Sequence, residues 1–122
     1  MFTIVITGSR EFNNYEILSE EMRSAFSEGD LFIVGDARGV DRAAIGICAG
    51  EGWSYMSFKA DWKRYGRGAG HIRNDEMLDQ NPDLFLAFWD GSSPGTKSMI
   101  DKALFRGINL KVVFDNERES SV

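Results

Sequence analysis

Three short, nearly continuous apolar runs divide this chain, and each leads into a turn that contains glycine. They span residues 2–7 (FTIVIT), 30–35 (DLFIVG) and 84–89 (LFLAFW) and are rich in β-branched and aromatic side chains. Strands of a parallel sheet that is covered on both faces have this pattern, whereas strands with one solvated face alternate apolar and polar residues. Residues 53–58 and 110–114 are weaker strand candidates. We therefore expect five strands.

Amphipathic segments lie between the apolar runs and predict helices. In residues 18–26 and residues 40–48, apolar side chains recur at i, i+4 and i+7, which gives each segment one apolar stripe. A shorter helix is expected over residues 72–78. Each of these helices can cover one face of a sheet.

A fourth helix is expected to begin at Ser93-Pro94, because serine is a good N-cap and proline suits the first helical position. Gly107 is its natural end. This helix is expected to bury Met99, Ile100, Ala103 and Leu104. Strands that alternate with helices at this spacing favour a Rossmann-like, doubly wound α/β fold, with a mainly parallel five-stranded sheet and helices on both faces. We expect one domain over residues 1–115 and a polar tail over residues 116–122.

Composition excludes several other classes of protein. The chain has 122 residues, of which 43% are hydrophobic, so it can bury a core. No apolar stretch approaches the roughly 20 residues that a membrane span needs, and we expect a cytoplasmic protein without a membrane partner. One cysteine, Cys48, and one histidine, His71, cannot form an internal disulfide or a standard zinc site. No metal or other cofactor is expected.

Charge is distributed unevenly along the sequence. The net charge is −5, yet residues 38–73 hold seven Lys or Arg against three acids, which is +4 and leaves −9 for the rest. An acidic protein repels nucleic acid, whereas a local group of arginines can still hold a few phosphates. The pattern favours a small anionic ligand over nucleic acid. The lysines of this region are better explained as exposed residues of a solvated loop.

Three loops follow expected strands and are candidate ligand-binding loops, because open α/β sheets bind ligands beyond the carboxyl ends of their strands. Glycine turns and helix N-termini in such loops present backbone N–H groups to anions, and arginine adds a bidentate phosphate contact. Tight turns and helix capping would explain some of the same residues, with Asp41 and Ser93 as caps. The candidates are Gly8, Ser9 and Arg10, then Gly35, Ala37, Arg38, Gly39 and Asp41, and finally Ser93, Gly95 and Thr96.

Residues 62–71 form a further candidate, read as a glycine-rich loop that could serve as a lid or ligand wall. Arg73 and Asn74 follow it at the start of the expected third helix, where the helix dipole disfavours a cation and an anion should lie nearby. Trp62 and Trp89 could stack on a base, although Trp89 ends a buried strand and fits the core equally well.

Six of these motifs, in this order, resemble the small stand-alone branch of the SLOG superfamily, which is found in bacteria and phages. They cover the chain from about residue 3 to residue 113. The motifs are Ile6-Thr7-Gly8-Ser9-Arg10, Gly35-Asp36-Ala37-Arg38-Gly39-Val40-Asp41, Ala60-Asp61-Trp62 with Tyr65-Gly66, Gly70-His71-Ile72-Arg73-Asn74, Ala87-Phe88-Trp89 and Ser93-Pro94-Gly95-Thr96.

The resemblance implies a Rossmann-like domain that binds nucleotides or nucleotide-derived molecules such as ADP-ribose, NAD derivatives or cyclic nucleotide signals. Related proteins include cytokinin-activating phosphoribohydrolases, DNA-processing proteins and sensor domains for cyclic ADP-ribose. Because one scaffold serves several functions, particular residues must decide between them.

One substitution counts against the hydrolase activity of these relatives. The phosphoribohydrolases carry a glutamate at the position that Met99 occupies here, and Asp101 lies about 200° around the helix from that position. Met99 also fits the apolar stripe of its helix. Asp41, Asp61, Glu76 or Asp90 could substitute for the glutamate, and nothing in the sequence selects one of them.

Binding without catalysis is therefore the leading hypothesis: a sensor or sequestering protein for a nucleotide-derived small molecule, acting as a homodimer or higher homo-oligomer. The alternative is a nucleotide hydrolase or phosphoribohydrolase that uses a different carboxylate. DNA binding comes third because of the net charge of −5.

Overall fold

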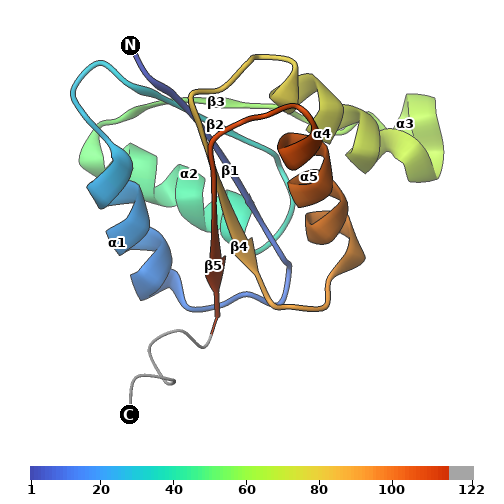
Figure 1. Cartoon of the computed structure of the whole chain (residues 1–122), viewed down its shortest axis with the longest axis horizontal. Helices are drawn as coiled ribbons and strands as arrows, with labels where there is room; N and C mark the ends of the chain where they lie inside the picture. The colour runs from blue at the N-terminus through green and yellow to red at the C-terminus, as the bar shows by residue number, and fades with distance from the viewer. Residues whose placement is uncertain (116–122) are drawn as a thin grey trace.

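A computed structural model describes residues 1–115 and contains a five-stranded parallel sheet of order β3-β2-β1-β4-β5 (Figure 1). The strands are β1 (Thr3–Gly8), β2 (Leu31–Val34), β3 (Ser54–Ser57), β4 (Leu84–Trp89) and β5 (Leu110–Phe114). The expected tail over residues 116–122 lies outside the described residues. Strand order therefore reverses between β1 and β4, which pair directly.

Helices cover both faces of the sheet, which confirms the predicted doubly wound α/β class (Figure 1). Figure 1 shows α1 and α2 on one side of the sheet and α4 and α5 on the other. The helical elements are α1 (Tyr15–Ala25), α2 (Val40–Glu51), α3 (Trp62–Tyr65), the 3₁₀ turn η1 (Gly66–Gly68), α4 (Ala69–Leu78) and α5 (Pro94–Phe105). Within residues 1–115, no helix has the length and apolar character that a membrane crossing requires.

Two hydrophobic clusters, one on each face of the sheet, form the core. Along β1, Ile4 and Ile6 join the cluster under α1 and α2, whereas Val5 between them joins the cluster under α4 and α5. Because both faces of the central strand are buried, its sequence is continuously apolar. Met99 lies in the second cluster and is 1% exposed, so its interpretation as a core residue is confirmed.

Two expectations about the helices are wrong. Residues 62–71 are not an irregular loop: they form α3, η1 and the first turn of α4, which begins at Ala69. Leu104 is not buried but 60% exposed. It points roughly 90° away from the centre of the buried stripe of α5, which is formed by Thr96, Met99, Ile100 and Ala103.

Gly8 allows the first turn of α2 to approach the end of β1 closely. A Cβ atom at Gly8 would lie 2.4–2.7 Å from the side-chain carbons of Val40, which is completely buried. Gly46, within α2, has open space around the corresponding position. The two glycines therefore differ in whether packing requires them.

We expect Gly8→Ala to lower the free energy of unfolding by about 1–3 kcal/mol, because a β-branched, buried Val40 cannot move aside without strain. Gly46→Ala is the matched control and should raise it by about 0.5–1 kcal/mol through helix propensity. Chemical denaturation measures both changes. A neutral Gly8→Ala variant would show that the contact between β1 and α2 is not tight.

Candidate functional site

A cavity of about 760 Å³ lies at the carboxyl ends of the strands, around the point where strand order reverses. This volume is within the range of small-molecule sites. The lining side chains come from the loops after β1, β2 and β4 and from α2, α3, η1, α4 and α5. The lining residues are Thr7, Gly8, Arg10, Glu11, Asp36, Ala37, Arg38, Asp41, Arg42, Trp62, Arg67, Gly70, His71, Arg73, Asn74, Asp90, Ser93, Pro94, Gly95 and Thr96.

The first turns of α2 and α5 line this cavity, and neither helix has a side-chain cap. Gly39 is the N-cap residue of α2, and Ser93 is that of α5 without bonding to the helix through its hydroxyl. By contrast, α1 lies outside the cavity and is capped by Asn14, which accepts the N–H of Ile17. The first N–H groups of α2 and α5 have no intrahelical acceptor and can bind an anion.

Ser9 holds the loops after β1 and β4 together beneath the cavity. Its hydroxyl lies 3.1 Å from that of Thr96 and accepts the N–H of Asp90 at 3.2 Å. Its own N–H donates to the carbonyl of Phe88 at 2.9 Å. Ser9 is buried and does not line the cavity, so it positions the site and does not face a ligand directly.

Asp90 organises the loop that precedes α5. Its Oδ1 atom accepts the N–H groups of Ser92 at 2.9 Å and of Ser93 at 2.7 Å. These bonds hold the pKa of the Asp90 carboxyl below its usual range. Asp90 thus fixes the loop up to Ser93, the N-cap residue, but does not replace a side-chain cap, and the N–H groups of Gly95 and Thr96 at the helix start have no side-chain acceptor.

Arg73 lies at the floor of the cavity and is 7% exposed. Its Nη1 donates to Asp36 Oδ1 at 2.5 Å, and its Nε donates to Asn74 Oδ1 at 2.9 Å. The expectation that Arg73 and Asn74 begin a helix is wrong, because α4 begins at Ala69 and Arg73 is its fifth residue. The anion beside Arg73 is a carboxylate of the protein.

Asp41 shares this floor and is also buried. Its Oδ2 accepts the N–H of Ala37 at 3.0 Å. Burial raises the pKa of Asp41 to about 6, an increase that the Ala37 hydrogen bond and the Arg73 charge oppose and that neighbouring Asp36 reinforces. Asp41 is therefore a carboxyl group that titrates close to neutral pH.

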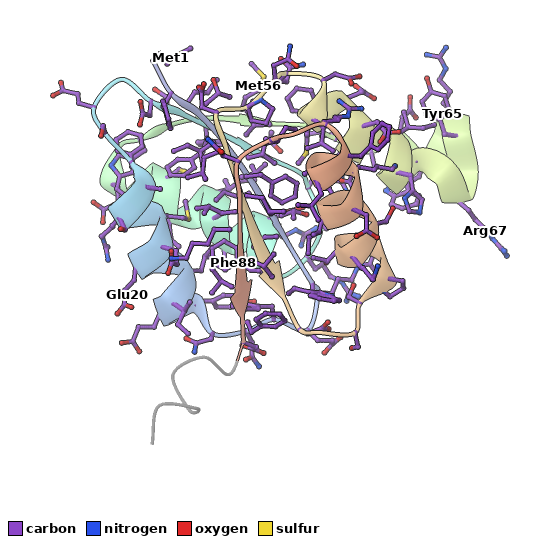
Figure 2. The ribbon with its side chains drawn as sticks, viewed as in Figure 1. Met1, Glu20, Met56, Tyr65, Arg67 and Phe88 are labelled. Atoms are coloured by element: carbon purple, nitrogen blue, oxygen red, sulfur yellow. The ribbon has the colours of Figure 1, made fainter. Side chains whose placement is uncertain are left out.

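Four exposed arginines border the cavity: Arg10, Arg38, Arg42 and Arg67. Within residues 1–115, none of the four forms an ion pair with an acidic side chain. Figure 2 shows Arg67 extending outward, which places it at the outer rim. Their charges are available to an anionic ligand.

The two candidate tryptophans have different environments. Trp62 lines the cavity and is 53% exposed. Trp89 does not line it: its Nε1 donates to the carbonyl of Ser93 at 3.1 Å, and its ring packs against Phe114. Trp89 is partly buried and packs against the core, close to the alternative that the sequence left open.

The structure brings most of the candidate residues to one cavity. Those that line it are Gly8, Arg10, Ala37, Arg38, Asp41, Trp62, Arg73, Asn74, Ser93, Gly95 and Thr96. Ser9, Gly35, Gly39 and Trp89 lie outside its lining. Gly39 has φ +82°, and a Cβ atom there would lie 3.0 Å from the carbonyl oxygen of Arg10, so its backbone conformation requires glycine.

The candidate binding residues did not include several residues that line the cavity, notably Asp36, Arg42, Arg67 and Asp90, although Asp90 was considered as a substitute for the glutamate of the phosphoribohydrolases. Asp36 and Asp90 lie in loops already under consideration, directly after β2 and β4. Arg42 follows Arg38 by four residues, so the spacing of one helical turn could have indicated it. Arg67 lies within residues 62–71, which were expected to form a lid or ligand wall, but nothing in the sequence distinguished it from its neighbours there.

Metal ligation finds no support in the described chain. In residues 1–115, no group of three or more His, Cys, Asp or Glu side chains is arranged to hold a metal ion. Hydrogen-bond donors, arginines and individual carboxylates are therefore the chemistry that this cavity offers.

The sequence is similar to the Gene 61 protein of Mycobacterium phage D29. The two are 35% identical over 118 residues, which cover 88% of this chain and 93% of the phage protein. This chain belongs to the family of that phage protein. No protein-family model matches the sequence, and no solved structure matches it.

The Asp41 carboxyl gives a pH test of the cavity floor. Because folding raises its pKa from 3.8 to about 6, the folded protein binds this proton more tightly than the unfolded chain does. Stability from this group is therefore full below about pH 4 and is lost as pH rises through about 6.

We expect wild type to gain about 2–3 kcal/mol in free energy of unfolding relative to Asp41→Asn as pH falls from 7 to 4. Chemical denaturation of both proteins at each pH measures the difference between their free energies of unfolding. The contributions of the other carboxylates are common to both proteins and cancel in this difference. Parallel pH profiles would mean that Asp41 is not buried in the folded protein.

Proposed function

We propose that this protein binds a nucleotide-derived small molecule, of the ADP-ribose, NAD-derived or cyclic nucleotide type, and that it does so as a stand-alone SLOG domain. The observation that carries the proposal is the combination of two uncapped helix N-termini with exposed arginines around one cavity. Phosphate groups of a nucleotide require this chemistry.

The division of charge around the cavity supports a small anion. Arg73 is buried against Asp36, so it cannot offer its full charge to a ligand. Arg10, Arg38 and Arg42 are exposed and without acidic partners among residues 1–115. Because the net charge of the whole chain is −5, a long polyanion would be repelled elsewhere on the surface.

The biological role that we propose is sensing or sequestration of the ligand by a cytoplasmic homodimer or higher homo-oligomer. The SLOG resemblance includes a branch found in phages, and the similar Gene 61 protein comes from a mycobacteriophage. A protein that sequesters a nucleotide signal needs affinity but no turnover, which agrees with a methionine at position 99, buried in the core.

A hydrolase is the second candidate, and one observation favours it. Asp41 lines the cavity and has a pKa of about 6, which suits a general acid or base near neutral pH. Of the four carboxylates considered from the sequence, Asp41 and Asp90 line the cavity, whereas Asp61 and Glu76 do not. Asp90 already accepts hydrogen bonds from the backbone N–H groups of Ser92 and Ser93 in its own loop. Asp41 is therefore the group through which such an activity would operate.

Ligand binding is tested by thermal shift with NAD, ADP-ribose, cyclic ADP-ribose isomers and nucleoside monophosphates. A ligand at one hundred times its Kd stabilises the fold by about 2.7 kcal/mol. Arg38→Ala should weaken binding by about 1.5–3 kcal/mol, the usual contribution of a hydrogen bond to a charged group, with the unliganded Tm unchanged.

Arg64→Ala is the matched control, because Arg64 is equally exposed and does not line the cavity. The Arg64→Ala variant should bind the same compound with the affinity of wild type. If no compound shifts the Tm of wild type at millimolar concentration, the proposed function is contradicted. If both arginine variants lose the same amount of ligand affinity, Arg38 has no specific role in binding.

Turnover separates the two candidate functions. We expect wild type to leave NAD, ADP-ribose and AMP intact after prolonged incubation, as measured by chromatography and mass spectrometry, because the cavity lacks the glutamate of the phosphoribohydrolases. Hydrolysis that disappears in Asp41→Asn and persists in Glu76→Gln, a control outside the cavity, would instead establish the hydrolase.

A further inference from the structure

Trp62 provides a large apolar surface in a cavity that is bordered by arginines. It is the first residue of α3 and remains 53% exposed while lining the cavity. A tryptophan ring in this position exposes apolar area to water that a flat, aromatic ligand could cover.

A helix cap fixes the backbone that carries Trp62, and the ring reaches toward α4. Asp61 caps α3 by accepting the N–H of Arg64 at 3.1 Å. On the α4 side, the Cη2 atom of Trp62 lies 3.6 Å from the position that a Cβ atom at Gly70 would occupy. The tip of the indole therefore lies close to Gly70 in the first turn of α4.

The phosphate-binding groups and this ring come from different parts of the cavity wall. The uncapped N-termini belong to α2 and α5, which follow β2 and β4, whereas Trp62 belongs to α3, which follows the edge strand β3. The cavity volume of about 760 Å³ also exceeds what one or two phosphates need.

We propose that Trp62 stacks on the base of the ligand, so that the site selects nucleotides that keep their base over sugar phosphates. The proposal rests on the proposed function, because it assumes that phosphates occupy the α2 and α5 side of the cavity. Trp62 is then a specificity-determining residue. Trp89 cannot take this role, since its indole N–H is bonded to Ser93 and its ring packs on Phe114.

AMP and ribose 5-phosphate form the test pair, because they differ only in adenine. Isothermal titration at pH 7.5 should give wild type a preference for AMP of about tenfold, the usual scale of one base stacked on an aromatic ring. Trp62→Ala should lose this preference because its affinity for AMP falls while its affinity for ribose 5-phosphate does not change. Trp62→Phe should keep most of the preference. The folding of both variants is checked by their Tm, which a change at a residue this exposed should leave near wild type.

Tyr65→Ala is the matched control. Tyr65 is an exposed aromatic residue of the same short helix, but it does not line the cavity (Figure 2). It should keep the preference for AMP in full. Quenching of tryptophan fluorescence by AMP should disappear in Trp62→Phe, because Trp53 is stacked on Phe26 in the core and Trp89 is bonded to its own loop.

Equal binding of AMP and ribose 5-phosphate by wild type, or equal losses of both in Trp62→Ala, would overturn the stacking role. That result would leave the proposed phosphate-binding role of the cavity uncontradicted. Failure of wild type to bind either compound at millimolar concentration would overturn the stacking role and would count against the proposed function as well.

Discussion

The reversal of strand order between β1 and β4 determines where this protein can bind a ligand. From β1 the chain continues to α1 on one face of the sheet, and from β4 it continues to α5 on the other face. The two loops separate at the carboxyl ends of paired strands and leave an opening there. Gly8 permits α2 to start close beside this opening, and the contact between the Ser9 and Thr96 hydroxyls fixes the distance across it. The cavity thus follows from the winding of the sheet.

Buried charges at the floor of this cavity stabilise one another. Two carboxylates, Asp36 and Asp41, lie near one guanidinium, that of Arg73. Burial is the main reason that Asp41 binds its proton more tightly than an exposed aspartate does, and the negative charge of Asp36 adds a smaller effect in the same direction, which the Arg73 charge opposes. Removing the arginine would leave two unpaired carboxylates, so Arg73 supports the fold as well as the site. An affinity change on mutation of Arg73 would combine both effects, whereas Arg38 isolates the contribution to binding.

The sequence was sufficient to predict the sheet, because continuous apolar runs identify strands buried on both faces. It predicted β4 and β5 with the bounds that the structure has. It was insufficient for α3 and η1: Trp62, Gly66 and Gly68 lie within these two short helical elements, whose glycine content is typical of an irregular loop. Nor could the sequence separate Trp62 from Trp89, or Arg38 from Arg73. Each pair has the same chemistry, and only tertiary packing determines which member packs against the rest of the protein.

Satisfaction of hydrogen bonds and charges distinguishes the residues that build this cavity from those that are available to a ligand. Ser9, Asp90 and Arg73 have partners within the protein, and those partners account for their positions. Arg38 and the N-terminal N–H groups of α2 and α5 lie at the same opening without such partners among residues 1–115. Backbone donors at a helix start are usually capped or solvated, and a cluster of exposed cations repels itself. An anion bound between them satisfies the donors and removes the repulsion, so the unpartnered groups at this opening are the physical argument for a phosphate-bearing ligand.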